Sequence, residues 1–146
     1  SHKNSNSQNY IAYCWHSVPG YSAFGTYEGS KTTFVYLGFR PAFLMVKAVP
    51  DQGGFNAYYP WTILDNARSP HNSTNPPLYA NMSKVENQRG DSSHTYSTSR
   101  TLDFLSNGFK IRNTGSHLNP DGQTLIYMAF AESPFVSSEG VPTTAK

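Results

Sequence analysis

The sequence has little of what several common protein classes need. It holds one cysteine among 146 residues, which excludes an internal disulfide framework. Charged residues make up 14% and the formal net charge is +2, so no strong field favours nucleic acid or an acidic membrane as a partner. No apolar stretch approaches the length of a bilayer span, which excludes a transmembrane helix. Apolar residues at helical spacing are also scarce, which disfavours a helical fold.

What the sequence has instead is the composition of strands and turns. Aromatic residues reach 14%, and short runs of aromatic and β-branched residues alternate with Gly, Pro and Asn. We therefore predict an all-β fold, an antiparallel β-sandwich of jelly-roll or lectin-like form with long loops. The expected strands are Tyr10 to His16, Tyr21 to Tyr27, Phe34 to Phe39, Ala42 to Val49, Phe55 to Leu64, Thr101 to Leu105, Phe109 to Asn113 and Thr124 to Ala131.

Turn residues indicate how these strands follow one another. Pro50 to Gly54 places Pro at a turn entry and Gly after it, which predicts a hairpin between the runs on either side. Ser106 to Gly108 and Asn119 to Gly122 are typical of turns that join adjacent antiparallel strands. Arg40-Pro41 is expected to link two strands tightly. Strand register is therefore set locally by turn chemistry.

Two segments near the ends of the sequence resemble each other. Gln8 to Pro19 aligns without a gap with Gln123 to Pro134, about 115 residues further on. Each has a polar start, an aromatic and aliphatic run, and a Pro that ends the strand because Pro cannot donate to a sheet ladder. The repetition predicts a piece of a longer protein of concatenated β-domains. We divide the chain into a linker at 1–9, one β-sandwich domain at 10–135 and a C-terminal tail at 136–146.

Asn66 to Ser99 is expected to be loop, because it is rich in Pro, Asn and Ser and poor in apolar runs. Only Leu78 to Met82 and Val85 are plausible anchors into the core. Loops this long in a compact domain are usually functional or mobile. If the protein binds a partner, the sequence favours these loops as the place.

Several ordered phrases resemble a family found in phage genomes. They include Tyr-Ile-Ala-Tyr-Cys-Trp at 10 to 15, Pro-Gly-Tyr-Ser-Ala-Phe-Gly-Thr-Tyr-Glu-Gly at 19 to 29, and Phe-Val-Tyr-Leu-Gly-Phe-Arg-Pro-Ala-Phe-Leu-Met-Val-Lys at 34 to 47. The likeness covers most of Gln8 to Phe135. The chain is similar to a β-sandwich module at the C-terminal end of tail-fibre and other virion structural proteins of tailed bacteriophages. Pro50 to Pro60 and Asn87 to Ser99 depart from the family pattern, which suits either a varied recognition surface or neutral drift in loops.

The residues needed for catalysis or metal binding show no convergent spacing. No pair of the nine Asp and Glu residues is placed by its spacing as a glycosidase pair, and no Gly-x-Ser-x-Gly elbow occurs. The five histidines lack metal-ligand spacing, although His16 or His117 of three chains could meet on a trimer axis. Cys14 lies between Tyr13 and Trp15, so we expect a buried small hydrophobe in place of a reactive thiol. We predict no catalytic residue, no metal and no cofactor.

The aromatic residues suggest a saccharide site. Sugars stack on aromatic faces while amides and charged groups bind their hydroxyls. Alternation along Phe55 to Leu64 nevertheless favours core packing for Trp61, and Arg68 is expected to pair with Asp65 and pin the loop. The candidate binding residues are Tyr58, Tyr59, Trp61, Arg68, Tyr79, His94 and Tyr96.

These observations together predict a non-enzymatic receptor-binding domain. The resemblance implies the distal part of a phage tail fibre in the virion, bound to upstream fibre domains and commonly homotrimeric. Its partner on the host would be a bacterial surface glycan or an outer-membrane protein, with no nucleic acid involved. The first alternative is a virion decoration or assembly module with no receptor role. The second alternative is a tailspike domain that degrades capsule.

Overall fold

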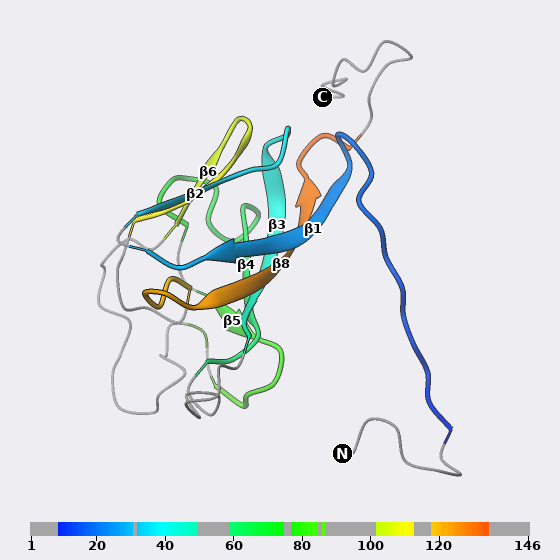
Figure 1. Cartoon of the computed structure of the whole chain (residues 1–146). Coiled ribbons are helices and arrows are strands. Elements are labelled where there is room, and N and C mark those ends of the chain that lie inside the picture. The colour runs from blue at the N-terminus through cyan, green and yellow to red at the C-terminus, as the bar shows by residue number, and fades with distance from the viewer. Residues whose placement is uncertain are drawn as a thin grey trace.

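The computed structural model contains two antiparallel β-sheets packed face to face (Figure 1). It describes residues 9–30, 32–49, 59–74, 77–84, 86, 102–112 and 118–134. None of these residues is helical, so this part of the chain offers no helix able to span a membrane. The predicted all-β sandwich is confirmed. The strands are β1 (Ser22–Glu28), β2 (Thr33–Tyr36), β3 (Pro41–Ala48), β4 (Thr62–Asp65), β5 (Leu78–Tyr79), β6 (Leu102–Leu105), β7 (Gly108–Ile111) and β8 (Thr124–Ala131).

The larger sheet is completed by β8, the last of the described strands in sequence. Its order is β1-β8-β3-β4-β5, and the smaller sheet has the order β2-β7-β6. β8 pairs antiparallel with β1 on one side and with β3 on the other. An interior strand has its backbone groups satisfied on both edges, whereas β1 and β5 keep one edge without a neighbouring strand. The sheet therefore depends on β8 to join β1 to the rest.

Alternate residues of the strands fill the space between the sheets. Leu44, Leu125 and Ala129 of the larger sheet have no exposed surface, and Phe104 and Phe109 of the smaller sheet are equally enclosed. Each strand turns one set of side chains inward because successive Cβ atoms point to opposite faces. Burying such side chains contributes roughly 1.5–3 kcal/mol each, which makes this layer the main source of stability.

Tyr27 ties the core to the turn that precedes β8. Its hydroxyl donates a hydrogen bond of 2.6 Å to the backbone oxygen of Leu118, and its ring lies 5.8 Å from that of Phe109 in an edge-to-face contact. Burial raises the pKa of Tyr27, because the charged phenolate would lie away from water. The side chain is thus neutral and hydrogen-bonded inside the sandwich.

The two predicted turns around β7 and β8 are present, with one difference in detail. Gly122, at φ +68°, supplies the left-handed residue of the turn before β8. In the other turn Ser106 and Asn107 form the two-residue loop, and Gly108 is already the first residue of β7. A Cβ at Gly108 would collide with the carbonyl oxygen of Val35. Position 108 therefore needs a glycine because β2 approaches it closely, and the turn conformation is not the reason.

Most of the expected strands occur, but several begin or end at other residues than predicted. Thr124–Ala131 matches β8 fully. The run from Phe34 ends early because Gly38 has φ +79° and turns the chain toward the other sheet. The run toward Leu64 begins as a strand only after Pro60, and its first part, like the predicted hairpin turn after Val49, lies outside the described residues. The short β5 was not expected, since two residues carry no periodicity.

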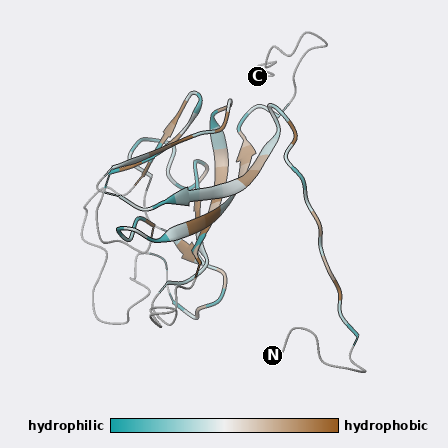
Figure 2. Ribbon diagram, viewed as in Figure 1, coloured by the Kyte–Doolittle hydropathy of each residue, from teal (hydrophilic) through white to brown (hydrophobic). Residues whose placement is uncertain are grey.

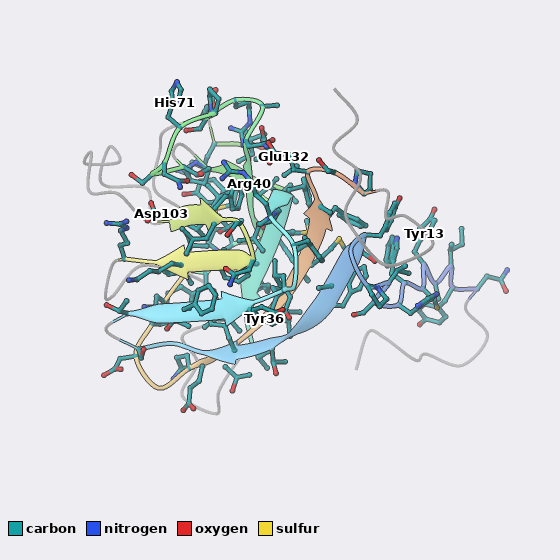
Figure 3. All side chains as sticks on the ribbon, turned by 90° about the horizontal axis from the view of Figure 1, so that it is seen from above. Tyr13, Tyr36, Arg40, His71, Asp103 and Glu132 are labelled. Carbon is teal, nitrogen blue, oxygen red and sulfur yellow. The ribbon has the colours of Figure 1, made fainter. Side chains whose placement is uncertain are left out.

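The expected strand at Tyr10 to His16 is wrong. Residues 9–17 run as an extended segment away from the sandwich, and only Val18 forms a bridge, with Ser22 (Figure 1). Figure 2 shows apolar residues along this segment, and Figure 3 places Tyr13 well outside the two sheets. The expected burial of Cys14 is also wrong, because its thiol is exposed. The predicted 10–135 domain thus includes a segment that belongs to neither sheet.

Candidate functional site

The predicted aromatic site is only partly described, and its described members are spread out. Tyr58, His94 and Tyr96 lie outside the described residues. Tyr79 is buried, where it faces Thr62 across β4 and β5. Tyr59 packs against the core. Tyr79 is therefore not open for stacking on a sugar, and Tyr59 is half-buried against the core.

Trp61 remains the best placed of these aromatic residues. The expectation that it packs in the core is wrong, because its neighbour Thr62 takes the inward position and Trp61 is partly exposed. Its backbone N–H donates to the side-chain oxygen of Asn81 at 2.9 Å, and its carbonyl accepts from Ala80 at 3.1 Å. A partly exposed indole on a backbone fixed by a side-chain amide is an arrangement that suits binding of a hydroxyl-rich ligand.

Arg68 fixes the start of the loop that follows β4. Its Nε lies 2.6 Å from Asp65 Oδ2, and its backbone N–H donates to Asp65 Oδ1 at 2.8 Å. Its Nη1 lies 2.7 Å from a carboxylate oxygen of Glu86. The predicted Asp65–Arg68 pair is therefore confirmed. The guanidinium holds two distant parts of the chain together, which is a positioning role.

The same loop is fastened to the smaller sheet by Asn72. Its amide nitrogen donates to the carbonyl of Phe104 at 2.9 Å, and its amide oxygen accepts from the N–H of Phe104 at 2.9 Å. Two residues on, Thr74 forms a bridge with Leu102. Asn72 thus behaves like a neighbouring strand and covers the open edge of β6. Between these anchors His71 is exposed at the outer end of the loop (Figure 3).

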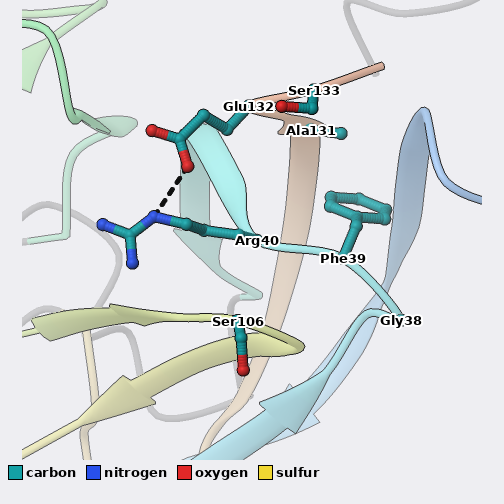
Figure 4. A pocket seen from close by; sticks show the side chains of 7 residues that line it. All are labelled: Gly38, Phe39, Arg40, Ser106, Ala131, Glu132 and Ser133. Carbon is teal, nitrogen blue, oxygen red and sulfur yellow. Dashed lines mark ion pairs between the residues drawn. The ribbon is translucent and has the colours of Figure 1, made fainter. Parts of the chain in front are cut away.

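A shallow pocket of about 240 Å³ lies where β3 begins and β8 ends (Figure 4). Arg40 Nε and Glu132 Oε2 are 2.8 Å apart at its rim, and Asn66 donates to the other Glu132 oxygen at 2.8 Å. The volume is below the range of roughly 300–1,000 Å³ usual for small-molecule sites. Sequence analysis missed this cluster because Arg40 and Glu132 are far apart in the chain. The pair fastens the end of β8 to the start of β3.

Asp103 is engaged with an arginine in the same way. Asp103 is almost fully buried and accepts from Arg112 Nε across the hairpin of β6 and β7. A buried carboxylate requires such a partner, since an unpaired buried charge is very costly. Within the described ranges no group of three His, Cys, Asp or Glu residues is close enough to hold a metal ion.

The outer face of the larger sheet is apolar and partly exposed. Phe24, Met128, Met45 and Ile63 stand opposite one another in a row across four strands. Beside this row, the ring of Phe130 lies 5.9 Å from those of Phe24 and Phe43. We call this surface the outer face; its apolar side chains are Phe24, Phe43, Met45, Ile63, Ile126, Met128 and Phe130.

Sequence reasoning missed the outer face, although a pattern for it exists. Seven of the eight residues of β8, Leu-Ile-Tyr-Met-Ala-Phe-Ala, are aliphatic or aromatic. A strand with one face in water alternates apolar and polar residues, whereas a strand covered on both faces does not. β8 therefore has the composition of a strand that is covered on both faces.

Comparison with protein families assigns this chain to a family. The model of the family described as "Domain of unknown function (DUF7483)" matches residues 1–134. The chain belongs to the DUF7483 family. Neither the curated proteins nor the solved structures contain a significant match. The family match does not bear on the likeness to phage tail fibres, which stays a prediction.

Two surfaces of the DUF7483 domain are thus available for function. One is the loop of residues 66–74, which the side chains of Arg68 and Asn72 hold in place, whereas Trp61 lies at the other end of β4. The other is the outer face, where apolar side chains of four strands lie side by side. The first suits a polar ligand, and the second suits another protein surface.

Proposed function

We propose that this DUF7483 domain is a non-catalytic host-attachment module at the distal end of a phage tail fibre, which binds a polysaccharide or protein on the bacterial surface. The ordered phrases shared with tail-fibre modules support the virion context. The loop at 66–74 carries the attachment role, because it is irregular in structure yet fastened by side-chain contacts at both ends.

Fastening of the loop favours binding for an energetic reason. A mobile loop loses conformational entropy when a ligand orders it, and that loss reduces affinity. Here Arg68 fixes the first turn and Asn72 fixes the last part, so His71 between them is presented without such a cost. Recognition groups on a rigid β-scaffold are the usual arrangement in binding domains.

The pairing of the charges supports binding without catalysis. Hydrolysis of a glycosidic bond uses two carboxyl groups that face each other across the bond. In this domain Asp65 and Glu86 share Arg68, while Glu132 pairs with Arg40. Groups committed to holding loops and strand ends are poorly suited to transfer protons to a substrate.

Binding of the full chain to host cells tests the proposal. The whole chain is screened against bacterial cells and surface glycans, and in competition with phage adsorption. We expect His71→Ala, in the loop, to weaken binding at least about tenfold, which corresponds to about 1.4 kcal/mol. Tyr36→Ala is the matched control, because Tyr36 is an exposed aromatic residue on β2 (Figure 3). Absence of binding and competition, or release of reducing ends from the glycan, would contradict the proposal.

The outer face favours a second candidate, which is assembly of the virion without a receptor role. An apolar face of this kind suits packing against other chains, as in a homotrimeric fibre. This candidate expects self-association that is lost in Met128→Lys, with no binding to host cells. Sedimentation of the parent and variant at several concentrations separates the two candidates.

A further inference from the structure

The N-terminal segment has the residues of a strand but not the neighbours of one. Tyr10, Ile11, Tyr13 and Trp15 are 53%, 83%, 75% and 58% exposed, and residues 9–17 belong to no sheet. Exposed apolar surface of this extent on an extended chain is unfavourable in water and indicates an absent partner. The segment lies off the sandwich throughout (Figure 1).

Its alignment with β8 assigns each residue to a face. The inward residues Leu125, Tyr127, Ala129 and Ala131 correspond to Tyr10, Ala12, Cys14 and His16. In both runs a small residue occupies the position of Ala129, which is fully buried. The first two positions lose the difference in volume between Leu and Ala, and the larger Cys14 and His16 offset it at the positions of Ala129 and Ala131. The outward residues Ile126, Met128 and Phe130 correspond to Ile11, Tyr13 and Trp15.

We propose that residues 9–17 form the interior strand of a second copy of this domain. In that copy they take the place of β8, between the strands equivalent to β1 and β3. The partner is thus another DUF7483 sandwich that precedes this one in a tandem chain. Strand addition of this kind satisfies backbone hydrogen bonds on both edges of the segment. It also covers Cys14 and Ala12 with the core of that copy.

The connection between the N-terminal segment and β1 is short, so the two copies would lie close together. Val18 and Ser22 exchange backbone hydrogen bonds of 3.0 and 2.9 Å, which close a tight turn. The side-chain oxygen of Ser17 accepts from the N–H of Phe24 at 3.0 Å, at the open edge of β1. The strand of one copy would therefore lead directly into β1 of the next, with no flexible linker between them. The inference does not depend on host attachment.

A tandem protein tests the proposal directly. Residues 18–122 are placed before Gln8 of the intact chain, so that Gln8 to Pro19 follows the first copy where its own β8 would be. We expect the backbone amides of residues 11–16 to exchange hydrogen more than about 100-fold slower than in the single chain. In the single chain these amides are expected to exchange freely. Protection there, or none in the tandem, would overturn the proposal.

A matched pair of lysine substitutions tests the assigned faces. In the tandem, Cys14→Lys places a charge in the core of the first copy, and we expect amide protection of residues 11–16 to be lost. Tyr13→Lys points outward and should leave that protection in place. In the single chain neither variant should change the unfolding midpoint, because both residues are exposed. Equal effects of the two lysines in the tandem would contradict the register.

A second measurement covers the case in which the tandem does not fold. In β8 of the single chain, Leu125→Tyr and Tyr127→Ala are introduced separately and together. We expect the double variant to be more stable than the sum of the two single effects, because the larger side chain occupies the space left by the smaller one. Additive losses would show that the inward residues of the segment do not fit the β8 position, and would overturn the assignment.

Discussion

Gln8 to Pro19 and Gln123 to Pro134 align residue for residue, yet the two segments have opposite surroundings. β8 has neighbours on both edges and contributes Leu125 and Ala129 to the core. The corresponding N-terminal residues Tyr10 and Cys14 are exposed. The sequence pattern of a strand thus determines which side chains share a face, whereas the neighbouring strands determine whether those faces are buried.

The largest difference between β8 and the N-terminal segment is expected when a charge is placed at the aligned positions Ala129 and Cys14. Ala129→Asp buries an unpaired carboxylate between the sheets, and we expect it to abolish cooperative unfolding, since such a charge costs roughly 3–5 kcal/mol. Cys14→Asp should stay within about 0.5 kcal/mol of the parent. Urea denaturation of both variants measures the difference. A stable Ala129→Asp protein would show that β8 is not packed in the core as described.

Truncation of an apolar side chain gives a smaller effect in the same direction. Leu125→Ala creates a cavity beneath β8, and we expect a loss of about 2–5 kcal/mol. Tyr10→Ala, at the aligned position, should cost less than about 0.5 kcal/mol. Both values come from denaturant midpoints at constant m. Similar losses for the two variants would mean that the segment contacts the sandwich in solution.

The dependence of stability on alkaline pH tests whether Tyr27 is buried in the core that β8 helps to form. Burial raises its pKa in the folded state above the unfolded value near 10, so the folded protein keeps a proton that the unfolded chain releases. Stability should be unaffected by this group below about pH 10 and fall above it by up to about 1.4 kcal/mol per pH unit.

Tyr27→Phe is the control for this pH dependence. It removes the hydrogen bond to Leu118, so we expect a loss of about 1–3 kcal/mol at neutral pH. It should also reduce the decline above pH 10, because one of the two tyrosines whose pKa burial raises is gone, while Tyr127 remains. Unfolding midpoints between pH 7 and pH 11 measure both effects. An unchanged alkaline decline in the variant would contradict the role given to Tyr27.

The smallest expected effect concerns the aromatic residues of the segment. Trp15→Ser should change stability by less than about 0.5 kcal/mol, because its ring contacts only the neighbouring Tyr13 among the described rings. A soluble quencher should reach Trp15 more readily than Trp61, since the first is 58% exposed and the second is partly buried. Comparison of quenching in Trp15→Phe and Trp61→Phe checks this. Equal quenching would indicate that the segment is covered.

Much of the fold could be predicted from the sequence, for reasons visible in particular elements. β8 was located fully because a polar residue precedes it and Pro134 follows a short way after it. The turn at Asn119 to Gly122 was recognisable because it needs a residue with positive φ. β5 escaped because it is two residues long. The strand at Tyr10 to His16 was wrong because a strand pattern does not specify the neighbouring strands, and none of the described strands pairs with these residues.

The candidate site could be predicted less well, because it depends on contacts between distant residues. The Asp65–Arg68 pair was foreseen since its members are three residues apart. Asn72 was not, because covering the edge of β6 requires knowing that β6 lies beside it. Trp61 and Tyr79 were grouped as binding residues, and the structure separates them by burial. Composition predicts which residues can bind, but packing selects those that are accessible.

The late position of β8 in the sequence affects how the protein emerges from the ribosome. β1 and β3 leave the exit tunnel long before β8 is synthesised. The apolar side chains that later contact β8 are therefore exposed to solvent during translation. Pairing of β1 with β8 closes a loop of nearly the whole domain, and such long-range contacts make folding slow. Nascent chains are therefore expected to need chaperones until the final strand is released.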